Sequence, residues 1–243
     1  MRLPRVYVDL PLVSGDTVRL PDGPARHLSQ VLRLVPGDRL AVFNGDGQDR
    51  EARVVATGRQ GVALEIGAAG PHEPEPPISV HLALGVSRGE RMDYAIQKAV
   101  ELGVAGIRPL FTERSMVQLA GERLERRMAH WEGVLIGACE QSGRRRLPRL
   151  EPARDYPNWI AESPPGVLLL DPESAQPLVG LARPAGPVTL LVGPEGGLSP
   201  KERALARAHG IAGVSLGPRI LRAETAPLAA MAAIQTLWGD FAG

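Results

Sequence analysis

A proline-rich segment divides the chain into two parts with different hydrophobic patterns. Residues 69–77, AGPHEPEPP, place four prolines in nine positions, a density that neither a helix nor a sheet interior tolerates. Short β-like runs precede this segment, and strands alternating with long helices follow it. We therefore predict two domains, residues 1–68 and 78–243, joined by a linker at residues 69–77. A long surface loop within one domain is the alternative.

The first part reads as a small β-barrel with one helical interruption. Its β-forming runs, separated by turn signals such as PGD and NGDG, are residues 5–8, 17–20, 39–43, 51–57 and 62–66. A helical pattern of apolar residues covers residues 25–34.

The second part alternates apolar strands with amphipathic helices. The predicted strands are residues 78–86, 106–110, 166–171, 188–193 and 213–217, and the predicted helices are residues 90–102, 124–141 and 225–238. This pattern predicts an α/β domain with a mainly parallel sheet. The last helix is apolar nearly all round, so it needs cover from a subunit interface or from a deep core.

Composition excludes several classes of function. No apolar run approaches the roughly 20 residues that cross a bilayer, and the first ten residues lack the apolar stretch of a secretory signal. We expect a cytoplasmic protein. The single cysteine, Cys139, lies in a helical pattern as a core residue would, and the histidines show no metal-ligand spacing, so we expect no metal. A net charge of +1 leaves any attraction to nucleic acid to local clusters.

Two neighbouring loops are candidates for a ligand site. LLVGPEGGLSPKE, residues 190–202, is a strand, a glycine-rich turn and a helix start with a capping box. GVSLGPRILRAETAPLAA, residues 213–230, repeats that order. Carboxyl ends of strands meet at one edge of a parallel sheet, so both loops should border one crevice. The alternative is a pair of tight turns without a ligand.

The apolar pair Ile220-Leu221 is unusual for a loop, because loop positions normally face water. The pair suits a floor beneath a flat group such as adenine. Tucking of the loop onto the core is the other interpretation.

Basic residues gather in three places that could contact phosphate. Four arginines follow a helix end within residues 144–149; Arg26, His27 and Arg33 lie in the first part, and Arg88 with Arg91 in the second. A solvated charge run remains the alternative.

Five segments together resemble the RsmE family of bacterial small-subunit ribosomal RNA uridine-N3 methyltransferases, members of the SPOUT superfamily. They are ARHLSQVLRLVPGD (25–38), RMDYAIQKAVELGV (91–104), EQSGRRRLP (140–148), LVGPEGGLSPKE (191–202) and LGPRILRAETA (216–226). They span both predicted domains in order.

The resemblance implies a PUA-like β-barrel, then a SPOUT domain with a C-terminal trefoil knot and a homodimer formed through that domain. It implies S-adenosylmethionine as cofactor and 16S ribosomal RNA, free or in the assembled small subunit, as partner. The cofactor residues implied are Leu169, Leu170, Val192, Gly193, Pro194, Glu195, Gly196, Leu216, Gly217, Ile220, Leu221, Arg222, Thr225 and Ala226. RNA-binding residues expected are Arg26, His27, Arg33, Arg88, Arg144 and Arg146.

Methylation at uracil N3 requires loss of the N3 proton, so the enzyme must stabilise a uracil anion or accept the proton. Arg222 is the candidate for stabilising charge on a uracil carbonyl. Glu195 and Glu224 are candidate bases, provided their surroundings raise their pKa. Helix-start electrostatics or loop hydrogen bonding are the alternative roles for both glutamates.

Two rival functions stay open. A non-catalytic RNA-binding or ribosome-assembly factor could use the same scaffold, although both candidate loops look intact. A SPOUT enzyme acting on transfer RNA or another ribosomal position is the other, because a fold does not fix a substrate.

Overall fold

A computed structural model describes residues 3–58, 61–115 and 119–242 of the chain. It consists of two compact units. Unit 1 comprises Met1–Glu75 with Cys139–Leu147, and unit 2 comprises Pro76–Ala138 with Pro148–Gly243. Within the described ranges, no helix is both long and apolar enough to cross a membrane.

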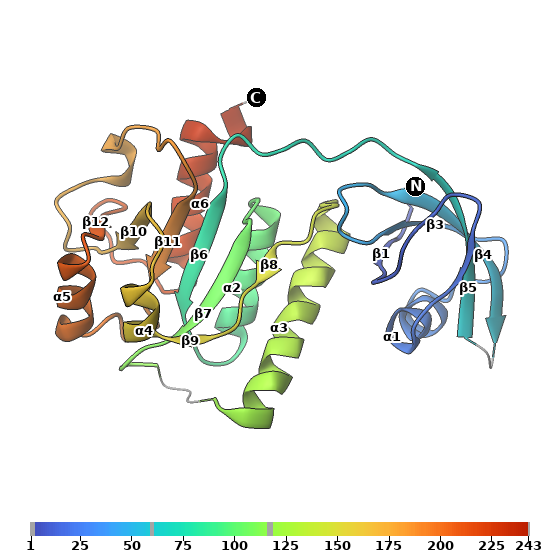
Figure 1. Cartoon of the computed structure of the whole chain (residues 1–243), viewed down its shortest axis with the longest axis horizontal. Helices are drawn as coiled ribbons and strands as arrows, with labels where there is room; N and C mark the ends of the chain where they lie inside the picture. The colour runs from blue at the N-terminus through green and yellow to red at the C-terminus, as the bar shows by residue number, and fades with distance from the viewer. Residues whose placement is uncertain (1–2, 59–60, 116–118, 243) are drawn as a thin grey trace. The chain divides into compact units, whose positions relative to one another are not determined.

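Unit 1 is built on a five-stranded sheet in the order β1-β3-β4-β5-β2 (Figure 1). Its strands are β1 (Arg5–Tyr7), β2 (Thr17–Arg19), β3 (Arg39–Phe43), β4 (Arg50–Gly58) and β5 (Gly61–Ala69). All neighbours pair antiparallel except β1 and β3, which are parallel. Alternate residues of β4 and β5, such as Val54, Leu64 and Ile66, are buried in one core, as the period of two requires. These strands match the predicted runs closely.

The predicted helix at residues 25–34 begins earlier and changes type. Helix α1 (Asp22–Arg26) is followed by a π-helical turn, η1 (His27–Val31). Leu28 is buried in the unit 1 core, whereas Val31 is exposed. Arg33 then takes a left-handed backbone conformation with φ of 54°, which ends the helical pattern before Leu34.

Residues 139–147 belong to unit 1 because their backbone and arginines bond to it. Arg5 Nη1 donates to the carbonyl of Cys139 at 2.7 Å, and the amides of Arg145 and Arg146 both donate to Glu73 Oε2. The sequence had grouped this segment with residues 78–243.

Unit 2 contains a seven-stranded, all-parallel sheet in the order β12-β10-β11-β6-β7-β8, with β9 also paired to β7. Its strands are β6 (Val80–Gly85), β7 (Gly106–Phe111), β8 (Arg149–Leu150), β9 (Arg154–Asp155), β10 (Val167–Leu170), β11 (Val188–Val192) and β12 (Ala212–Val214). All five residues of β11 are buried, as expected for a strand covered on both faces. The sequence predicts an α/β unit with a mainly parallel sheet, and the structure confirms it.

Helices cover both faces of this sheet. The helices of unit 2 are α2 (Glu90–Glu101), α4 (Tyr156–Ala161), α5 (Pro200–Ala208) and α6 (Thr225–Trp238), together with most of α3 (Gly121–Ser142); the short turns are η2 (Leu178–Gly180) and η3 (Asp240–Ala242). On one face α4 and α5 share a core with Ala83 and Leu191. On the other, α6 contacts both α2 and β11. Figure 1 labels these helices around the strands of unit 2.

Candidate active site

A cavity of about 590 Å³ opens at the carboxyl ends of β10, β11 and β12. Its walls come from the residues that follow these three strands. Such a volume lies in the range of small-molecule sites, and an edge where parallel strands end is the usual position for a ligand. The residues that line it are Arg91, Leu169–Glu173, Val192–Leu198, Arg203, Val214, Leu216, Gly217, Arg219–Glu224 and Ala226.

The first wall is the glycine-rich turn between β11 and α5. A Cβ on Gly193 would lie 2.8 Å from the amide nitrogen of Leu198, so only glycine lets the turn fold back on itself. The amide of Gly197 donates to the carbonyl of Pro194 at 2.8 Å, and Gly197 has a φ of 66°. Ser199 and Glu202 form the predicted capping box, which holds the turn at the start of α5.

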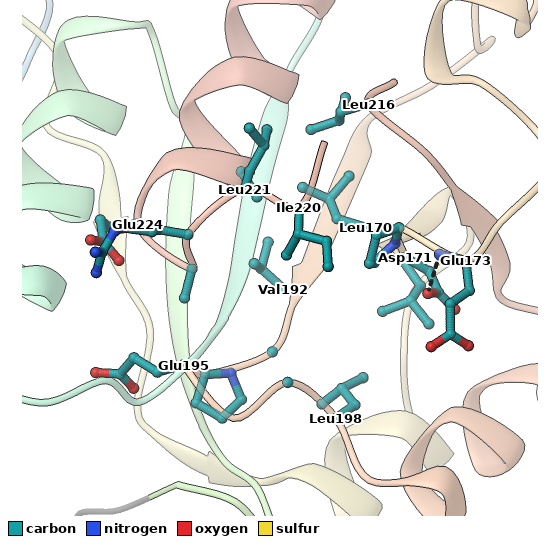
Figure 2. A pocket seen from close by; sticks show the side chains of 18 of the residues that line it. Leu170, Asp171, Glu173, Val192, Glu195, Leu198, Leu216, Ile220, Leu221 and Glu224 are labelled. Carbon is teal, nitrogen blue, oxygen red and sulfur yellow. Dashed lines mark hydrogen bonds between the residues drawn. The ribbon is translucent and has the colours of Figure 1, made fainter. Parts of the chain in front are cut away.

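The second wall is the loop between β12 and α6, and it presents apolar side chains. Ile220 is 87% exposed although it lines the cavity, and Leu221 is half-buried. Figure 2 shows Leu170, Val192, Ile220 and Leu221 gathered in the middle of the pocket. An isoleucine this exposed gains nothing from burial within the chain, so it is available to cover an apolar ligand surface.

Arg91, at the start of α2, links the two walls. Its Nη1 donates to Glu195 Oε1 at 2.9 Å, and its Nε lies 3.9 Å from Glu224 Oε1. Glu195 comes from the first wall and Glu224 from the second, and Figure 2 shows both on the same side of the pocket. Sequence reasoning noted Arg91 only as a basic residue. Arg91 can bridge Glu195 and Glu224 because the strand order brings these positions, far apart in the sequence, to one edge of the sheet.

The Glu195 carboxylate is held in its ionised form. Burial acts to raise its pKa, but the hydrogen bonds from the amide of Arg88, the Arg91 guanidinium and other donors together lower the pKa below the ordinary value. The requirement set for a general base, a raised pKa, is therefore not met. Its second oxygen, Oε2, is buried with no hydrogen-bond partner among the described residues.

Acidic side chains form the opposite side of the pocket. Asp171 and Glu173 follow β10, and Arg203 of α5 reaches them with its Nη1 at 3.6 Å and 2.8 Å, respectively. Figure 2 shows both carboxylates across the pocket from Glu195 and Glu224. Carboxylates of this kind can accept hydrogen bonds from ligand hydroxyls. The sequence does not single out these three residues, because a DPES turn after a strand carries no distinctive signal.

All the predicted cofactor residues line this cavity except Thr225, which lies at the first position of α6 beside it. Arg222 lines the cavity and is exposed. It has no ion-pair partner within the ranges that the structure describes. Whether these residues hold the cofactor stays a prediction.

The predicted RNA-binding residues fall into two groups. Arg26, Arg33 and Arg88 are exposed, and His27 is half-buried. Arg144 and Arg146 are instead engaged within unit 1: Arg144 Nε lies 3.9 Å from Glu73, and Arg146 Nη2 lies 2.8 Å from Glu75.

Cys139 is buried, and burial raises the pKa of its thiol to about 11, so it is a poor nucleophile. Within the described part of the chain, no three His, Cys, Asp or Glu side chains are grouped as metal ligands would be.

Two family profiles of RNA methyltransferases match the chain. Residues 74–235 match the profile of the RNA methyltransferase domain, and residues 20–67 match that of the RNA methyltransferase PUA domain. The chain is therefore an RNA methyltransferase with an N-terminal PUA-like domain.

Individual relatives define the family. The chain is 30% identical to ribosomal RNA small subunit methyltransferase E from Buchnera aphidicola, covering 98% of each chain. It is 41% identical, with a TM-score of 0.94 and coverage of 99% and 100%, to the crystal structure of the Neisseria gonorrhoeae enzyme of that name bound to S-adenosyl methionine. A Legionella pneumophila structure containing the bound cofactor SAM is 35% identical, with a TM-score of 0.95 and the same coverage. The chain belongs to the ribosomal RNA small subunit methyltransferase E family.

Proposed function

We propose that this protein transfers a methyl group from S-adenosylmethionine to N3 of a specific uridine in 16S ribosomal RNA. The observation that carries the proposal is the cavity enclosed by two successive strand-end loops, one glycine-rich and one apolar. Family membership and the S-adenosylmethionine-bound Neisseria gonorrhoeae relative support the cofactor and the substrate class.

The residues present fit S-adenosylmethionine. Ile220 and Leu221 offer an apolar surface for adenine, and the glycine-rich turn from Gly193 to Gly197 lines the cavity opposite them. Asp171 and Glu173 supply acceptors for ribose hydroxyls. When bound there, the cofactor supplies a methyl group on a sulfonium, which passes to uracil N3 as the N3 proton departs.

Arg222 has one role in this proposal, and Arg91 with its partner Glu195 has another. Arg222 is exposed at the cavity, so its permanent positive charge can stabilise the negative charge that develops on a uracil carbonyl. Glu195 and Arg91 hold the two walls at a fixed separation, which aligns the reacting atoms. The lowered pKa of Glu195 argues against Glu195 as the base, and Glu224, the other candidate, also lines the cavity.

The two-part organisation follows from the same family. We infer that the first unit closes as a PUA-like β-barrel that positions RNA, with residues 69–77 as linker and residues 78–243 as the SPOUT domain containing a C-terminal trefoil knot. Exposed Arg26 and Arg33 support phosphate contact by the barrel, and exposed Arg88 supports it beside the cavity.

We further propose a cytoplasmic homodimer that acts on 16S RNA or on the assembled small subunit. Leu237 and Phe241, at 43% and 53% exposure, leave apolar surface at the end of α6. A second copy could cover that surface.

Methyl transfer from labelled S-adenosylmethionine to unmodified small subunits, compared with naked 16S RNA, tests the function. Nucleoside mass spectrometry should find one labelled 3-methyluridine per RNA. Cofactor binding without any transfer to either substrate would favour the assembly-factor alternative. Label in another nucleoside would refute the assigned position.

A further inference from the structure

The first turns of α3 carry a stripe of basic side chains that the cofactor site does not use. Arg123, Arg126, Arg127 and His130 are spaced by three and four residues, so they share one face of the helix within an arc of about 100°. Together with Leu119 they line a shallow hollow. Glu125 and Glu132 fall on the opposite face by the same spacing, whereas Glu122 lies beside Arg126.

The stripe is available to a partner. Arg123 and Arg126 are exposed, and Arg126 meets only the exposed Glu122, at 3.6 Å, a pair that solvent screens. Arg127 lies with its guanidinium 6.0 Å from the Trp131 ring centroid, which fixes its stem. His130 Nε2 lies 2.7 Å from Asp93 Oδ2, so this side chain is engaged within unit 2 and the three arginines are the groups offered to a partner.

Topology places this stripe at the same sheet edge as the cavity. Strand β7 ends at Phe111 and α3 begins at Gly121, and Figure 1 shows the first turn of α3 at the end of the sheet where β7 terminates. Because β8 pairs in parallel with the start of β7, α3 must run back toward the opposite edge. The segment after β7 also touches the cofactor turn directly, since Arg114 Nη1 donates to the carbonyl of Gly196 at 2.8 Å.

We propose that Arg123, Arg126 and Arg127 form a phosphate-binding surface for the RNA backbone flanking the target uridine. Guanidinium groups suit phosphate oxygens, and Arg123 to Arg127 span roughly 6 Å along the helix at about 1.5 Å per residue, enough for neighbouring phosphates of one strand. The inference rests on the proposed function for its substrate. The stripe is an arginine cluster separate from Arg144 and Arg146, which form ion pairs within unit 1.

The test compares the variant Arg123→Gln/Arg126→Gln with Lys98→Gln/Arg207→Gln. Both remove two positive charges, but Lys98 and Arg207 lie in the last turns of α2 and α5 and not at the catalytic edge. Affinity for unmodified small subunits is measured between 50 and 200 mM salt, with calorimetry of S-adenosylmethionine and thermal melting for each variant.

We expect the α3 variant to bind subunits about tenfold more weakly, with a salt slope shallower by about 1.5, as two lost phosphate contacts imply. Cofactor affinity and melting should stay at wild-type values. Wild-type RNA affinity and slope in the α3 variant, or an equal loss in the control variant, would overturn the surface. Failure of the wild type to bind S-adenosylmethionine or transfer methyl would instead refute the proposed function, so the two failures are distinguishable.

Discussion

Gly85, the last residue of β6, supports the first wall of the cavity from behind. Strands β6 and β11 pair in register, with Leu84 opposite Val192, so Gly85 lies directly under the turn that follows β11. An ideal Cβ at position 85 would be 2.4 Å from the nitrogen and 2.5 Å from Cδ of Pro194. Those distances fall roughly 1 Å short of ordinary contact.

The substitution Gly85→Ala must therefore move the turn, because the nearest atom belongs to backbone and no rotamer can relieve the overlap. Overpacking of this kind costs about 1–3 kcal/mol. For a chain of this size each kcal/mol lowers Tm by about 2–4 °C. A wall displaced by about 1 Å misaligns the donor and acceptor, which we expect to reduce kcat/KM about 100-fold.

Calorimetry with S-adenosylmethionine and a methyl-transfer assay measure these effects, and Gly186→Ala is the control. Gly186 precedes β11, and a Cβ there meets nothing within 4 Å, so this variant should match the wild type. Cooperative thermal unfolding of Gly85→Ala would show that the variant is folded, so that weaker cofactor binding can be attributed to the displaced turn. Cofactor affinity and turnover of Gly85→Ala equal to those of the wild type would refute the view that this turn is a rigid wall.

Four further predictions concern substitutions at single residues. Glu195→Gln should weaken cofactor binding by loosening the link that Arg91 makes between the two walls while leaving the acid limb of the pH–rate profile in place; a kcat loss of about 10²-fold or more with unchanged affinity would make Glu195 the base. The stability advantage of the wild type over Glu195→Gln should be present above the ordinary glutamate pKa of about 4.3 and lost as pH falls through the lowered pKa of the folded protein, measured by urea unfolding across pH. Ile220→Asp should lower cofactor affinity at least about tenfold, since the adenine surface loses its apolar cover, whereas Val179→Asp, at a similarly exposed valine, should not; equal affinities in calorimetry would remove Ile220 from the site. Gly133→Ala, in an exposed part of α3 with open space around it, should stabilise the protein by about 0.5–1 kcal/mol, and a lower Tm would contradict that helix assignment.

Much of the secondary structure of unit 2 could be predicted because its signals are local. The capping box of α5 and the bounds of α6 depend on residues close together in the sequence, and the structure confirms both predictions. Strands β8 and β9 have only two residues each, too few for a periodic pattern, and α4 is a six-residue helix between prolines and acidic residues. Such short elements depend on the sheet that they join.

The candidate site also combines features that local sequence predicts with features that depend on residues far apart in the chain. The two strand-end loops carry distinctive sequences, so their meeting at one cavity follows from parallel-sheet topology. Arg91 could not be assigned to that cavity, because its partners Glu195 and Glu224 lie far along the chain. For the same reason the sequence could not show that Arg144 and Arg146 form ion pairs with Glu73 and Glu75, and RNA contact by these two arginines stays a prediction.

Crystals grown with S-adenosylmethionine test whether the two loops enclose the cofactor. We expect density for one cofactor per chain between the turn after β11 and the loop before α6, with adenine against Ile220 and Leu221. Density at any other place, with these two loops unchanged and the cavity filled only by solvent, would contradict this expectation.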